Sequence, residues 1–92
     1  MEENRKEYAF ILCVNKKLTK VIAKGWHNDT EGMRQQKVAM AAAARVFKKT
    51  AGVLVYENRG LSCDWNFFEG SFIPSDMYIP DTISIYGDKV YA

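Results

Sequence analysis

The chain has 92 residues, too few to enclose two separate hydrophobic cores, so the sequence predicts a single domain over residues 1–92. Hydrophobic residues make up 48% of it and charged residues of both signs 26%, a balance that favours a folded protein over a disordered one. With one histidine, two isolated cysteines and no glycine-rich phosphate loop, the composition predicts a protein that is not an enzyme and holds no cofactor.

The first apolar run, from Tyr8 to Val14, also bears on cellular location. It is shorter than the roughly 20 apolar residues of a membrane helix, and it lacks the cationic start and the length of a secretion signal. We therefore expect a cytoplasmic protein with no membrane association.

The N-terminal part of the chain predicts a β-hairpin. Residues 8–14 are apolar at both parities, as expected of a central strand covered on both faces. A short polar turn follows, and residues 18–23 resume a strand pattern. On this second strand Thr19, Val21 and Ala23 are predicted to share one face, small enough for a helix to approach closely.

One long helix is predicted next. Asn28 is a candidate N-cap, and Glu31 is placed to complete a capping box. Residues 33–50 contain neither Gly nor Pro, and Gly52 fits the left-handed position that ends many helices. The apolar side chains predicted to face the sheet fall within about 60° of one another. They are Met33, Met40, Ala44, Phe47 and Ala51.

The C-terminal half reads as further strands. Residues 53–56 predict a short apolar strand that ends in a turn at residues 57–60. Strict alternation of apolar and polar residues over 61–67 predicts a fourth strand with one solvated face. Pro74 and Pro80 bracket a segment that is not a central strand.

Residues 83–91 predict a final short hairpin that turns at a Gly-Asp pair. Together these elements give the order ββαββ plus a C-terminal hairpin. The predicted fold class is therefore α+β, a single domain with one long helix packed on an antiparallel sheet.

Reactive side chains are few. Cys13 and Cys63 lie far apart without C-x-x-C spacing, which predicts free buried thiols, with a disulfide as the alternative. His27, Asp29 and Glu31 form the one cluster of metal-ligand types, but it coincides with the signal for the helix start. We expect capping there and no metal site.

Charge is distributed unevenly although the net charge is only +2. Residues 4–49 carry eleven Lys and Arg against three acidic residues, whereas residues 50–92 carry two against six. Four cations of the predicted helix fall on one edge: Arg34, Lys37, Arg45 and Lys48. No acidic residue occurs between Glu31 and Glu57, so this helix offers them no neighbouring carboxylate. The edge is predicted to be exposed, serving either solubility or an anionic partner.

A second basic group lies on the predicted hairpin, with aromatic residues close by in the sequence, including Tyr8 and Phe10. Cations interleaved with aromatic rings bind single-stranded nucleic acid through phosphate pairing and base stacking. The remaining candidate binding residues are Lys16, Lys17, Lys20, Lys24, Trp26 and Lys49. No RNA-recognition, zinc-finger or GXXG motif is present, so a dedicated reader of base sequence is not expected.

In its length, its compact ββαββ plan directly after Met1, and its basic stripe of Arg34, Lys37, Arg45 and Lys48, the chain resembles small phage-encoded anti-CRISPR proteins that block type I surveillance complexes. The resemblance implies an inhibitor in the host cytoplasm that docks on a larger protein or ribonucleoprotein complex and blocks nucleic-acid target binding. Many such inhibitors are acidic mimics of DNA, whereas residues 4–49 are basic. The resemblance therefore implies contact with guide RNA or with an acidic protein surface.

The alternative is an autonomous RNA or single-stranded DNA binding module that uses the same basic helix and hairpin surfaces. An autonomous binder retards a short RNA by itself at low salt, whereas a docking protein needs its partner complex. A monomer is favoured under both interpretations.

Overall fold

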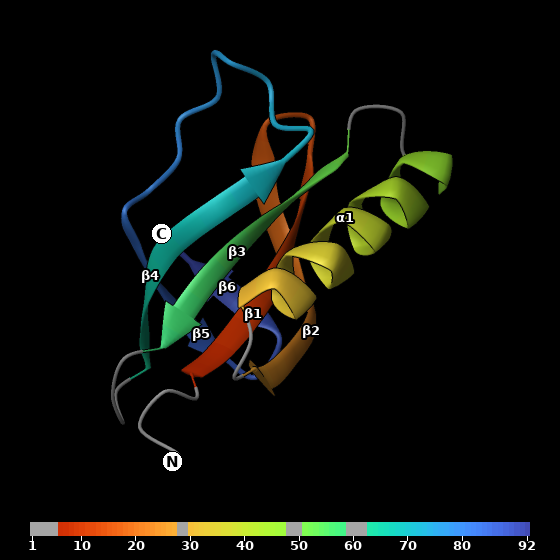
Figure 1. The fold of residues 1–92 in the computed structure, drawn as a ribbon. Helices are drawn as coiled ribbons and strands as arrows, with labels where there is room; N and C mark the ends of the chain where they lie inside the picture. The colour runs from red at the N-terminus through yellow and green to blue at the C-terminus, as the bar shows by residue number, and fades with distance from the viewer. Residues whose placement is uncertain (1–5, 28–29, 48–50, 59–62) are drawn as a thin grey trace.

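Figure 1 shows the computed structural model of the chain, which describes residues 6–27, 30–47, 51–58 and 63–92. These residues form one small α+β domain with a single helix and a six-stranded antiparallel sheet, as the sequence predicts, and the sheet dominates. In chain order the elements are β1 (Lys6–Val14), β2 (Lys17–His27), α1 (Thr30–Phe47), β3 (Gly52–Asn58), β4 (Asp64–Ser71), β5 (Thr82–Tyr86) and β6 (Lys89–Tyr91).

The strand order is β2-β1-β3-β4-β5-β6, and every neighbouring pair is antiparallel. The sheet curls so strongly that its last hairpin returns to its first strand, where the Val21 amide donates to the Asp88 carbonyl at 3.1 Å. The result approaches a barrel, with α1 lying across its outside (Figure 1).

This curvature explains why β1 and β3, the two central strands, carry apolar residues at both odd-numbered and even-numbered positions. Successive side chains of a strand point to opposite faces, and both faces of β1 and β3 are covered. One cluster fills the inside of the curled sheet: Ala9, Ile11, Cys13, Leu54, Tyr56, Trp65, Met77, Ile83 and Ile85. A second lies between the sheet and α1: Tyr8, Phe10, Met33, Ala41, Val53 and Val55. The prediction of a central strand covered on both faces is confirmed.

The second strand departs from its predicted pattern because it contains β-bulges. Ile22 is an additional residue between the pairs that Val21 and Ala23 make with β1. Val21 consequently packs into the inner cluster, whereas Ala23 packs against the cluster under α1. A bulge adds one residue and interrupts the alternation of faces. The prediction that Thr19, Val21 and Ala23 share one face is therefore wrong.

The helix packs on the sheet through a stripe close to the predicted one. Met33 and Ala41 are buried, and Met40 and Ala44 are half-buried. Of the other predicted members, Ala51 is buried in the link to β3, and the side chain of Phe47 lies outside what the structure describes. The predicted N-cap, Asn28, also lies outside the described residues.

The predicted role of Gly52 as a helix cap is wrong. Gly52 is the first residue of β3 and pairs with Cys13, and among the described glycines only Gly87 has a positive φ. Gly52 is required for a different reason, since a Cβ placed on it would lie 2.7 Å from the Ser71 carbonyl oxygen and 2.8 Å from that of Phe72. The absence of a side chain lets the backbone at the end of β4 approach β3 closely.

The remaining C-terminal elements largely follow the sequence. Strand β3 continues through residues 57 and 58, which were predicted to belong to a turn. The Pro-bracketed segment contains no strand and covers the inner cluster with Met77, and the Tyr56 hydroxyl donates to the Pro80 carbonyl at 2.6 Å. The β5–β6 hairpin turns at Gly87, whose φ of 67° suits a tight turn.

Both cysteines are free thiols, as predicted, but the prediction that both are buried holds only for Cys13. Cys13 is buried in the inner cluster, and this burial raises the pKa of its thiol to about 11. Cys63 is only half-buried, and its thiol donates to the hydroxyl oxygen of Tyr86 at 3.0 Å.

The close approach of the β4 backbone to Gly52 predicts that alanine destabilises the protein more at position 52 than at position 70. In Gly52→Ala the new methyl group meets backbone oxygens, which cannot move without displacing β4, and overpacking of this kind costs about 1–3 kcal/mol. In Gly70→Ala it meets mainly the flexible ends of the Leu54 and Ile73 side chains. Urea denaturation should therefore show a larger loss of unfolding free energy for Gly52→Ala than for Gly70→Ala, and the reverse order would contradict the register of β3 and β4.

Candidate anion-binding surface

Among the predicted binding residues, Lys37 is the one whose environment differs most from the prediction. It is only 5% exposed and lies on the buried face of α1, one turn from Met33 and one turn from Ala41. The aliphatic part of a lysine side chain can cover apolar surface while its ammonium group reaches a polar partner. The prediction that Lys37 stands on an exposed edge is therefore wrong.

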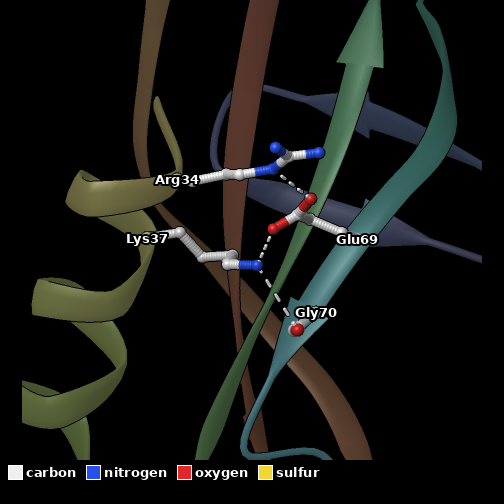
Figure 2. Close-up of polar contacts among 4 residues, drawn as sticks. All are labelled: Arg34, Lys37, Glu69 and Gly70. Atoms are coloured by element: carbon white, nitrogen blue, oxygen red, sulfur yellow. Dashed lines mark hydrogen bonds and ion pairs between the residues drawn. The ribbon is translucent and has the colours of Figure 1, made fainter. Parts of the chain in front are cut away.

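The partner of this ammonium group is Glu69 on β4 (Figure 2). The Lys37 Nζ donates to the Glu69 Oε2 and also lies 3.4 Å from the Gly70 carbonyl oxygen. From one turn earlier on the helix, the Arg34 Nε donates to the Glu69 Oε1 at 2.9 Å. One carboxylate thus serves two of the four cations that were predicted to line an exposed edge, for solubility or for an anionic partner.

A β-bulge places Glu69 beneath the helix. Tyr56 pairs with Phe67 and Val55 pairs with Glu69, so Phe68 is an additional residue in β4. Directly paired residues share a face of the sheet, and Val55 belongs to the cluster under α1. Phe68 also packs against this cluster. The one sequence signal of this arrangement is the adjacent pair of phenylalanines, which breaks the period of two.

Electrostatics fit a carboxylate held between two cations. Partial burial opposes ionisation of Glu69, but the hydrogen bonds and charges of Lys37 and Arg34 outweigh it and lower the pKa of Glu69 below its ordinary value of 4.5. No buried side-chain nitrogen or oxygen among the described residues lacks a hydrogen-bond partner. The Lys37–Glu69–Arg34 cluster is therefore an ion-pair network internal to the fold.

The rest of the predicted helix edge does not form a continuous basic stripe in the described chain. The Arg45 guanidinium lies over the ring of Phe72, 4.5 Å from its centroid, a cation–π contact. Lys48 and Lys49 lie outside the described residues.

The hairpin lysines are placed differently. Lys16 forms an ion pair with Asp76 at 2.5 Å, and the hydrogen bond from this ammonium group lowers the pKa of Asp76. Lys17, Lys20 and Lys24 are exposed, and none of them makes an ion pair with another described residue. Among the described candidate cations these three lysines of β2 and Arg45 have no carboxylate partner in the described fold, and Arg45 is held on the ring of Phe72 instead.

The register of β2 distributes these side chains over both of its faces. Lys17 and Lys20 pair with even-numbered residues of β1, whereas Lys24 and Trp26 pair with odd-numbered ones. The β5–β6 turn meets β2 between these side chains, where the Val21 amide donates to the Asp88 carbonyl, so Lys17 and Lys20 lie on one side of this contact and Lys24 and Trp26 on the other. We call Lys17, Lys20, Lys24 and Trp26 the β2 surface.

Of the aromatic residues near these lysines in the sequence, Trp26 is the most exposed. It is 55% exposed, whereas Tyr8 and Phe10 are buried under α1. Tyr8 and Phe10 occupy the helix-facing side of a central strand, as the prediction of a strand covered on both faces implies, and do not belong to this surface.

Comparison of the chain with family models, with curated proteins and with solved structures found no match in any of the three. Among the described residues no group of three His, Cys, Asp or Glu side chains could hold a metal ion. Asp29, one of the three residues weighed as metal ligands, lies outside the described part of the chain. The helix that the structure describes is not long and apolar enough to cross a membrane.

The internal network predicts a specific pH dependence for Glu69→Gln. Removing the carboxylate leaves the buried Lys37 ammonium without its anion, so we expect the unfolding free energy at about pH 7 to fall by about 1–3 kcal/mol. Because the pKa of Glu69 is lowered in the folded state, its contribution is present above its ordinary value of 4.5 and is lost as the pH falls through the folded pKa. Urea denaturation across this range should show the two proteins converging in acid.

Lys37→Met is the control for that experiment, because it removes the buried charge but keeps the apolar stem and leaves Arg34 on Glu69. We expect it to cost less than Glu69→Gln. Equal stability of the parent and Glu69→Gln at neutral pH would contradict the network.

Proposed function

We propose that this protein is a small non-enzymatic interaction protein that docks on a ribonucleoprotein complex through the β2 surface, where its lysines meet RNA phosphates. The observation that carries the proposal is that the fold gives carboxylate partners to some of the candidate cations and not to others. Lys16, Arg34 and Lys37 have carboxylate partners within the fold, whereas Lys17, Lys20 and Lys24 are exposed without one among the described residues. Uncompensated cations on one strand are suited to an anionic partner.

The dimensions of the β2 surface support an extended ligand. At about 3.3 Å per residue, Lys17 to Lys24 spans on the order of 20 Å, comparable with the path of several nucleotides in a single-strand groove. The exposed indole of Trp26 lies two residues beyond Lys24, where it can stack on a base. Phosphate pairing and stacking are both tolerant of base sequence, in keeping with the absence of a base-reading motif.

Within this function, the partner class we propose is a CRISPR-type surveillance complex carrying its guide RNA, which the protein inhibits by blocking target binding. Support comes from the resemblance in size and plan to anti-CRISPR proteins and from the basic β2 surface, which suits RNA and does not imitate DNA. The alternative function, autonomous binding of RNA or single-stranded DNA, would use the same lysines, which are exposed and have no ion pair with another described residue.

The combined change Lys17→Gln, Lys20→Gln and Lys24→Gln tests the β2 surface. It should leave the fold intact, because surface changes of this kind usually alter stability by no more than about 0.5 kcal/mol each. Fluorescence anisotropy with a short single-stranded RNA, and with a purified type I surveillance complex, should show weaker binding. Affinity falls as salt rises, and each lost phosphate contact makes the slope of log affinity against log salt less steep by about 0.7. The magnitude of this slope should therefore decrease by about 2.

Arg45→Gln is the charge control, since it removes one positive charge from an exposed side chain that lies on α1 against Phe72 and not on β2. Binding to the complex but not to free RNA supports docking, and binding to free RNA alone supports the alternative. Weaker binding with an unchanged salt slope indicates an acidic protein surface instead of phosphate. Equal binding by the triple variant and the parent would refute the β2 surface.

A further inference from the structure

The outward side of α1 has an unusual composition for a surface helix. Between Arg34 and Arg45 its exposed side chains carry no charge: Gln35, Gln36, Val38, Ala39, Ala42 and Ala43. Val38 is 50% exposed, and Val46 at the end of the helix is 78% exposed. A helix that only covers a core normally turns charged residues to solvent. In Figure 1 α1 forms an outer layer of the molecule, so this side of the helix is accessible.

A regular seam runs along this side. Five exposed residues recur at intervals of four, three, four and three positions: Glu31, Gln35, Val38, Ala42 and Arg45. This is the spacing by which one helix packs against another along a coiled-coil seam. The surface is slightly hollowed at a shallow depression lined by Glu31, Arg34, Gln35, Val38 and Ala39, which can receive a small side chain of a facing helix.

The seam carries an acidic residue at one end and a basic residue at the other, so two antiparallel copies of the seam have complementary charges. Glu31 and Arg45 each lie seven residues from Val38, nearly two turns, which places all three within about 20° of one line. An antiparallel second copy related by a two-fold axis at Val38 sets Glu31 of each copy against Arg45 of the other. The same axis sets the small Ala42 side chain into the depression of the facing helix. The contact of Arg45 with Phe72 holds this guanidinium at the edge of the seam.

We propose that α1 pairs with α1 of a second copy of this chain in this antiparallel arrangement. The inference does not rest on the proposed function, because no seam residue belongs to the β2 surface. It replaces the monomer that the sequence favours with a two-fold symmetric dimer. A seam of five residues on each side belongs to the class of small, transient interfaces, so the dimer should form in a concentration-dependent manner.

Sedimentation equilibrium on the full chain tests this directly. In low salt the average mass should rise with concentration from 10.5 kDa toward twice that value, within a range that extends to about 1 mM. Val38→Glu sets two carboxylates against each other at the axis and should raise the dissociation constant by about tenfold or more. Gln36→Glu adds the same charge about 160° around the helix and should leave association unchanged.

Charge reversal tests the orientation. In a homodimer of Glu31→Arg, or of Arg45→Glu, like charges face each other across the axis, so each variant alone should stay monomeric. In a mixed dimer of the two variants, one copy carries two arginines and the other two glutamates at these positions. An equal mixture should therefore associate, because every pair across the axis is attractive. Circular dichroism confirms that each variant is folded. A parent that remains at 10.5 kDa throughout would overturn the proposal, as would equal association of the Val38 and Gln36 variants, or a mixture that stays monomeric.

Discussion

The carboxylate of Glu69 determines which way the helix faces and hence which surfaces the protein can offer to partners. A buried ammonium group is costly unless an anion and further acceptors satisfy it, and Glu69 with the Gly70 carbonyl provides them for Lys37. Because Arg34 binds the same carboxylate from the helix edge, two contacts fix the rotation of α1 about its axis. This rotation buries Met33 and turns the side containing Val38 outward.

Two surfaces follow from this arrangement, and they depend on different physics. On β2 the lysines remain without described partners, so this surface attracts anions over a range set by salt screening. The seam on α1 has no net charge, with Val38 and Ala42 between Glu31 and Arg45, so its contacts are short-ranged and require a matching helix. Long-range attraction and short-range self-pairing can therefore operate independently on a domain this small.

The sequence predicted those features that depend on local chemistry. Alternation and apolar runs predicted the order of the strands, and the Gly-Asp pair predicted the last turn, because each depends on neighbouring residues, but β4 runs to Ser71, beyond the predicted end at residue 67. The errors arose where distant segments meet. The bulges at Ile22 and Phe68 shift faces without a local signal strong enough to place them, and Gly52 is needed by the backbone of β4. The exposure of the β2 lysines was predictable, whereas the pairing of Lys37 depends on a carboxylate 32 residues away.

The central claim is that Lys37 is held inside the fold while the β2 lysines face solvent. Lysine-selective nuclear magnetic resonance of the ammonium groups tests it most directly, because hydrogen bonding and burial slow the exchange of ammonium protons with water. At neutral pH Lys37 should give a resolved ammonium signal that disappears in Glu69→Gln, while Lys20 and Lys24 exchange too fast to be seen. Exchange at Lys37 as fast as at Lys20 would contradict the account.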